Sequence, residues 1–127
     1  MILQTAFASV LLLLSAGTFA SCVTDDHPKG PIEGGVVIET EDADYELVAR
    51  PDTLRLYIRG HGTRIDLLEL DARIALVTGK SKQVVGLHPV FDRLEATGSF
   101  QIGARTKAVA IITRPSKPAT TVRFTLK

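Results

Sequence analysis

The sequence predicts an all-β domain, because apolar and polar residues alternate at a period of two over several short segments. In residues 53–59, TLRLYIR, the residues Leu54, Leu56 and Ile58 fall on one face of an extended strand. Gly, Pro and Asp separate such segments about every 8–12 residues, with no amphipathic helix between them. This spacing favours a small antiparallel β-sandwich of immunoglobulin-like architecture, with seven or eight short strands, over a parallel α/β sheet.

Each strand is expected between two turn signals of the chain. The expected strands are residues 35–40, 45–49, 53–59, 73–77, 83–88, 93–97, 107–113 and 122–127. The AVAII run within 107–113 predicts burial on both faces or a central position in a sheet. Residues 65–72, IDLLELDA, are the one segment that predicts a helical turn, which would cross between the two sheets.

The first 35 residues are expected to lie outside this domain. Residues 6–20 form an uncharged apolar run, shorter than the roughly 20 residues of a membrane-spanning helix and followed by small residues, which is typical of a signal peptide. Residues 19–22, FASC, resemble a bacterial lipobox, in which cleavage precedes a cysteine that carries lipid. We therefore predict a lipoprotein-type signal peptide at 1–21, a lipid on Cys22, a flexible Pro- and Gly-containing tether at 22–35, and one domain at 36–127.

A signal peptide predicts that the protein is exported, and both the cleavage site and the membrane that holds the anchor remain to be considered. Ordinary cleavage after Ala20 would leave Cys22 as a lone thiol in an exported protein, which lipidation would remove. Val23 is not the Asp associated with inner-membrane retention, so the lipobox resemblance implies anchoring in the outer membrane, facing the periplasm. The membrane is then a partner through the lipid.

Charge and motif content argue against two further classes of function. Lys and Arg total 15 against 14 Asp and Glu, and the two signs are interspersed, whereas a nucleic-acid binder gathers a basic excess. No Gly-x-Ser-x-Gly turn occurs, and the only cysteine is the predicted lipid site. The acids Glu39, Glu41, Asp42 and Asp44 are expected to form a solvated turn, so the protein is predicted not to be an enzyme.

Transition-metal binding is the better functional candidate from the residues themselves. The tether contains His27 with Asp25, Asp26 and Glu33, and imidazole with carboxylate suits zinc or copper(II). His61, in RGHGTR, is a further candidate ligand, although a histidine between two glycines also suits a turn. His88, before Pro89, is expected to be structural or exposed. Arg55, Arg59 and Arg64 could instead form a basic patch for an acidic partner.

A resemblance to known proteins lies in residues 34–37, 44–50, 56–58, 61–62, 93–100 and 122–127, which are mostly strand and turn residues. Over these residues the sequence resembles a group of small exported bacterial proteins that often accompany copper and other heavy-metal efflux systems. It implies the sandwich fold and components of a metal efflux system as partners. The His-Gly-Gly step of that group reads Glu33-Gly34-Gly35 here, and His61 matches its His-Gly turn.

Two hypotheses follow from these observations. The leading one is a non-enzymatic, lipid-anchored periplasmic domain that binds or hands over a transition-metal ion, copper or zinc, in heavy-metal efflux or resistance. Its ligands would be His27 with Asp25, Asp26 or Glu33, and His61. The alternative is a metal-independent module that docks onto another envelope protein through a sandwich edge or an arginine face.

Overall fold

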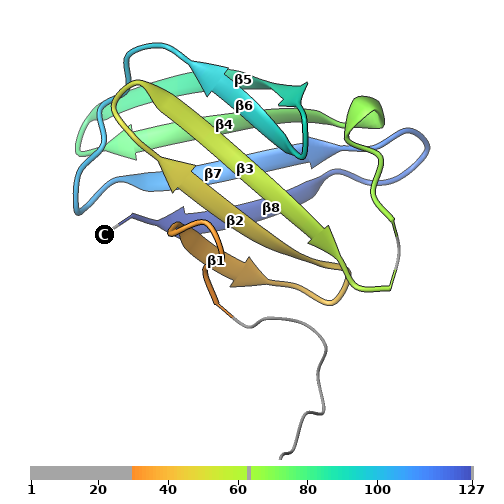
Figure 1. Ribbon diagram of the computed structural model, residues 1–127. Coiled ribbons are helices and arrows are strands. Elements are labelled where there is room, and N and C mark those ends of the chain that lie inside the picture. Colours follow the sequence, from red (N-terminus) through yellow and green to blue (C-terminus); the bar gives the residue numbers. More distant parts are fainter. Residues whose placement is uncertain (1–29, 63, 127) are drawn as a thin grey trace, which may run out of the picture.

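A computed structural model of the chain describes residues 30–62 and 64–126. It confirms the predicted all-β fold: eight antiparallel strands form a nearly closed sheet in the order β1-β2-β3-β6-β5-β4-β7-β8 (Figure 1). The strands are β1 (Val36–Glu39), β2 (Ala43–Ala49), β3 (Thr53–Gly60), β4 (Asp71–Thr78), β5 (Ser81–Val90), β6 (Arg93–Thr97), β7 (Lys107–Thr113) and β8 (Thr120–Thr125).

The sheet folds over at β5, which is long enough to pair with different neighbours along its length. Residues 81–87 pair with β4, and residues 88–90 pair with β6. One layer therefore contains β1, β2, β3 and β6, and the other contains β4, β7 and β8, which lie behind it in Figure 1. The two end strands, β1 and β8, contact each other and nearly close the sheet.

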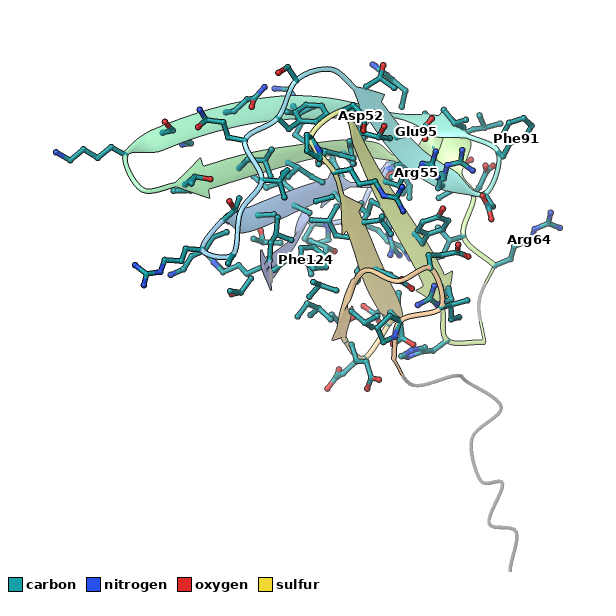
Figure 2. All side chains as sticks on the ribbon, turned by 60° about the vertical axis from the view of Figure 1, so that its left-hand side comes forward. Asp52, Arg55, Arg64, Phe91, Glu95 and Phe124 are labelled. Carbon is teal, nitrogen blue, oxygen red and sulfur yellow. The ribbon has the colours of Figure 1, made fainter. Side chains whose placement is uncertain are left out.

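The core fills the space between these layers with the inward side chains of β2 to β8, and the partly buried Val36 and Ile38 of β1 pack against it. Alternation explains its composition, because every second residue of a strand points to the same face. Its largest fully buried apolar side chains are Tyr45, Leu47, Leu54, Leu56, Ile74, Leu94, Ile112 and Phe124. Figure 2 shows Phe124 between the layers. On β7 only alternate residues are buried and Ile111 is 45% exposed, so the AVAII run reflects a central position and not burial on both faces.

The one described helical element is η1 (Leu67–Glu69), a single 3₁₀ turn where a helical turn was predicted. The side chain of Asp66 caps it by accepting a hydrogen bond of 3.1 Å from the Leu68 N–H. The segment connects β3 in one layer to β4 in the other, as expected for a crossing between sheets. Among the described residues, no helix has the length and apolar character needed to cross a bilayer.

Residues 30–35, the described part of the predicted tether, are fastened to the domain. The Glu46 carboxylate, on the outer face of β2, accepts backbone N–H hydrogen bonds from Ile32 (2.9 Å), Glu33 (2.8 Å) and Gly35 (2.9 Å). Gly35 lies so close to β2 that a Cβ there would collide with the Leu47 carbonyl group. The segment therefore covers the outer face of β2, which the sequence alternation alone would leave in water.

Candidate functional site

The predicted metal ligands divide into two groups. His27, Asp25 and Asp26 lie outside the described residues, as does the predicted lipid site, Cys22. Glu33 has an exposed side chain, and its backbone N–H donates to Glu46. Within residues 30–62 and 64–126, no three His, Cys, Asp or Glu side chains lie together as a metal site would require. The metal site thus stays a prediction that depends on the upstream residues.

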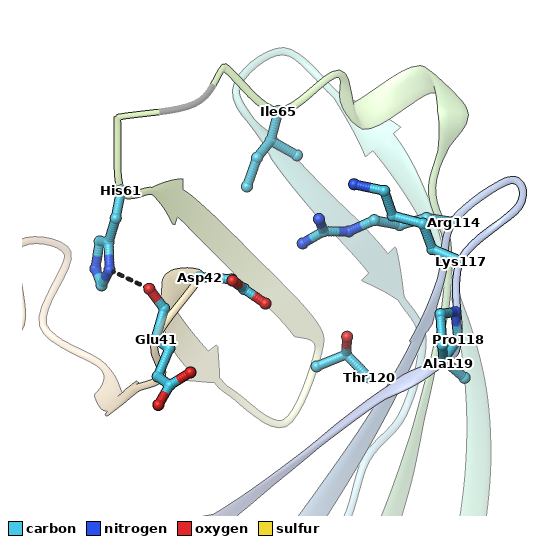
Figure 3. A pocket seen from close by; sticks show the side chains of 9 residues that line it. All are labelled: Glu41, Asp42, His61, Ile65, Arg114, Lys117, Pro118, Ala119 and Thr120. Atoms are coloured by element: carbon cyan, nitrogen blue, oxygen red, sulfur yellow. Dashed lines mark hydrogen bonds between the residues drawn. The ribbon is translucent and has the colours of Figure 1, made fainter.

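His61 is held by hydrogen bonds at both ring nitrogens. Nε2 lies 2.8 Å from Oδ1 of Asp44, which is itself buried, and Nδ1 lies 3.1 Å from the Glu41 carbonyl oxygen, the dashed line in Figure 3. Both partners are acceptors, and only the imidazolium form donates from both nitrogens. Hydrogen bonding to Asp44 and to the Glu41 carbonyl raises the pKa of His61 above its ordinary value. A metal ion on either nitrogen would have to displace one of these acceptors.

Glu46 is the best-satisfied ionised group of the described chain, and nothing in the sequence singled it out. Its carboxylate is fully buried and accepts four hydrogen bonds, three from backbone N–H groups and one of 2.9 Å from Nη2 of Arg59. Burial acts to raise the pKa of Glu46, but the hydrogen bonds from Gly35, Ile32, Arg59 and Glu33 outweigh burial and hold the pKa below its ordinary value.

Of the four acids predicted to form a solvated turn, Glu41 and Asp42 do so and border a pocket of about 380 Å³ between the β1–β2 turn and the β7–β8 turn (Figure 3). The prediction was wrong for Asp44, which is buried on β2 against His61, and Glu39 is the last residue of β1. Glu41 and Asp42 line one side, with exposed side chains, and Arg114 and Lys117 line the other. Nε of Arg114 is buried and has no hydrogen-bond partner among the described residues. The pocket therefore has acidic side chains on one side and basic side chains on the other.

The arginine patch suggested by the sequence does not form on the outer face of β3. Arg55 is paired with Glu95 at 2.7 Å, and Arg59 is paired with Glu46 at 2.9 Å. Figure 2 shows Arg55 and Glu95 side by side on the sheet, with Arg64 projecting away at another part of the surface. The cations of this face are thus neutralised within the molecule.

An unpaired cationic surface lies instead on the opposite layer. Four basic side chains point outward from four different strands, and none of them forms an ion pair with another described residue. The only acid at an outward position of these strands is Asp71. The four residues are Arg73 (β4), Lys82 (β5), Lys107 (β7) and Arg123 (β8). We call these four cations and the apolar residues that lie between them the basic face.

The strand register places apolar side chains at the centre of the basic face. Ala75 lies between Val84 on β5 and Val109 on β7, and Val109 is followed across the sheet by Arg123. Val84 is 60% exposed, and Ile111, opposite Arg73, is 45% exposed. Exposed apolar residues surrounded by charged ones are typical of an interaction surface.

Comparisons with known proteins give no independent indication of function. Searches against protein-family models, curated proteins and solved structures found no match to this chain. What the site can do must therefore be argued from its own chemistry.

Proposed function

We propose that this protein is a non-enzymatic interaction module of the bacterial envelope, which docks through its basic face onto an acidic surface of another protein. The observation that carries the proposal is the presence of four cations without ion-pair partners among residues 30–62 and 64–126, around exposed apolar side chains. An acidic partner with an apolar centre would be complementary to this face in both charge and hydropathy.

The contrast between the two layers supports a role in binding. On the outer face of β2, β3 and β6, the cations Arg55, Arg59 and Arg93 each have a carboxylate partner within 3.4 Å. Pairing of that kind satisfies the charges inside one molecule. Unpaired charges on the other layer are available to steer a partner of opposite charge and to fix its orientation.

A protein partner fits the position of the chain's entry better than a membrane does. Residues 30–35 approach the domain on the outer face of β2, which is the layer opposite the basic face. If Cys22 carries the proposed lipid in the outer membrane, the anchor joins the domain on that side. The chain would then leave the domain on the side opposite the basic face, so the anchor itself would not cover that face.

Photocrosslinking in the producing cell tests the proposal at the basic face. A photoreactive amino acid at position 84 should form protein adducts, whereas one at position 117, an exposed residue off the face, should not. Arg73→Glu combined with Arg123→Glu should reduce the position-84 adduct at least tenfold, as expected for reversing two interfacial charges, and Lys117→Glu should leave it unchanged.

The identity of the adduct decides between partners. Mass spectrometry of the adduct should map to an acidic surface of one protein. Equal labelling from both positions, or no adduct from position 84, would refute the proposal. Binding of the lipid-free domain to phosphatidylglycerol vesicles at 0.15 M salt, without a protein adduct, would assign the basic face to the membrane instead.

Transition-metal handling is a separate proposal that the basic face neither requires nor excludes. Its upstream ligands His27, Asp25 and Asp26 precede the first described residue, and the exposed Glu33 carboxylate lies where they join the domain. Both proposals would hold together if the partner were a component of a metal efflux system, because an acidic surface on that component could bind the basic face.

A further inference from the structure

The turn between β5 and β6 exposes a large aromatic side chain in an unfavourable backbone conformation. Phe91 and Asp92 connect Val90 to its cross-strand partner Arg93, so the turn has only two residues. Phe91 has φ of +54° and is 94% exposed. Gly or Asn adopts positive φ with much less strain, and a bulky residue there is a genuine outlier. Folding alone does not account for a phenylalanine at this position, because its side chain is left almost wholly in solvent.

A second exposed apolar side chain lies near Phe91, beside a hollow in the surface. Leu68 of η1 is 83% exposed, although it belongs to a turn that is capped by Asp66. A hollow of about 680 Å³ separates η1 from the β5–β6 turn. This surface, which we call the Phe91 surface, is lined by Ile58, Arg64, Ile65, Asp66, Leu67, Leu68, Pro89, Phe91 and Asp92.

The charges on the Phe91 surface are of both signs. Arg64 is exposed and projects from the same end of the molecule as Phe91 (Figure 2). The side chain of Asp92 is 73% exposed, and its contact with Arg93 is long, at 3.4 Å. Asp66 is exposed as well, and its carboxylate also caps η1. The surface thus offers a cation and two acids around its apolar centre.

We propose that the partner of the Phe91 surface is a second copy of this chain in a symmetric dimer. A two-fold interface brings the same patch of both copies together, so the patch must complement itself. The Phe91 surface meets this requirement, because it carries a protruding side chain next to a hollow and a cation next to acids. Phe91 of each copy enters the hollow of the other, and Arg64 of each copy lies against Asp92 of the other.

Other occupants fit this chemistry less well. An anionic membrane would be repelled by Asp66 and Asp92, which outnumber Arg64 on the surface. The residues involved are fewer than the 20–30 per partner of a standard interface, so the dimer should be weak, with a Kd on the order of 10–100 μM. The Phe91 surface is separate from the basic face, and this inference does not depend on the proposed function.

Sedimentation velocity of the chain beginning at residue 22, with Cys22→Ser, provides the first test. The sedimentation coefficient should rise with concentration between about 1 and 500 μM as dimers form. Phe91→Asn should weaken dimerisation at least tenfold, because an aromatic anchor is lost. This variant should fold normally, since Asn tolerates positive φ. Val84→Ser, an exposed apolar residue of the basic face, is the matched control and should leave the dimer unchanged.

Charge exchange provides the second test and is specific for a two-fold arrangement. Arg64→Glu and Asp92→Arg should each weaken self-association, because each places like charges opposite one another. A one-to-one mixture of the two variants should associate more strongly than either alone, since both charge contacts of the mixed pair are then between opposite charges. A wild-type chain that stays monomeric throughout, an unaffected Phe91→Asn variant, or a mixture that does not associate would overturn the proposal.

Discussion

Replacing Glu46 by glutamine should release the N-terminal segment and destabilise the domain by about 2–4 kcal/mol. The wild-type carboxylate accepts two hydrogen bonds at each oxygen: Ile32 and Arg59 donate to Oε1, and Glu33 and Gly35 donate to Oε2. In Glu46→Gln, one oxygen becomes an NH₂ group, which cannot accept and which faces two donors.

The size of this stability loss follows from the two hydrogen bonds that are lost in Glu46→Gln, whichever way the amide is oriented. Hydrogen bonds to charged groups contribute about 1.5–3 kcal/mol each, so the pair contributes roughly 3–6 kcal/mol. Undocking of residues 30–35 lets the freed N–H groups reach water and reduces the net loss, which gives the estimate of about 2–4 kcal/mol. The matched control is Glu95→Gln on the same face. Its partner Arg55 is 42% exposed, so screening by water makes the loss in Glu95→Gln much smaller than that in Glu46→Gln.

Two measurements check this prediction on the chain beginning at residue 22 with Cys22→Ser. Urea unfolding should give the two stability losses, large for Glu46→Gln and small for Glu95→Gln. Amide hydrogen exchange should show that Ile32, Glu33 and Gly35 are protected in the wild type and exchange freely in Glu46→Gln. A loss below about 1 kcal/mol, or protection of these amides in the variant, would refute the proposed fastening.

Three further predictions concern pH, backbone packing and metal. Because the pKa of Glu46 is lowered, its contribution to the free energy of unfolding is complete above pH 4.5 and is lost on acidification. Because the pKa of His61 is raised, its contribution is complete below pH 6.5 and is lost as the pH rises. Urea midpoints should therefore be highest between these two pH values, and His61→Gln should reduce the decline at alkaline pH. Gly35→Ala should displace β1 and cost about 1–3 kcal/mol, because its Cβ would meet the Leu47 carbonyl, and unchanged thermal unfolding would contradict this. Zinc and copper(II) calorimetry should show saturable binding that His27→Ala weakens and His61→Ala does not, and flat titrations with both ions would remove the metal proposal.

The sequence was a good guide to the strands because each one is defined locally. Alternation at a period of two and the turn residues identify a strand and its faces without knowledge of its neighbours. All eight expected segments are strands, and the helical turn appears at 67–69 within the expected 65–72. The boundaries shifted by a few residues, since β5 extends to Val90 through Pro89 to pair with β6.

The interaction surfaces could not be predicted because they depend on which strands become neighbours. Arg73, Lys82, Lys107 and Arg123 are scattered over 51 sequence positions, and only the register of β4, β5, β7 and β8 gathers them. Arg55 looked like an unpaired cation for the same reason, because Glu95 is 40 residues away in sequence. No local signal distinguishes the buried Glu46 from any other acid on a strand's outer face.

If Cys22 carries the proposed lipid, the fastening of residues 30–35 also limits how far the domain can travel from that anchor. Were residues 22–35 all extended, a lipid on Cys22 would allow the first strand a reach of about 49 Å, at about 3.5 Å per residue. With the chain held from Ile32 onward, only residues 22–31 contribute, and the reach is about 35 Å. The accessible volume varies with the cube of the reach and falls to about one third. In a lipid-anchored protein, Glu46 would thereby raise the local concentration of the domain near any envelope protein within that reach.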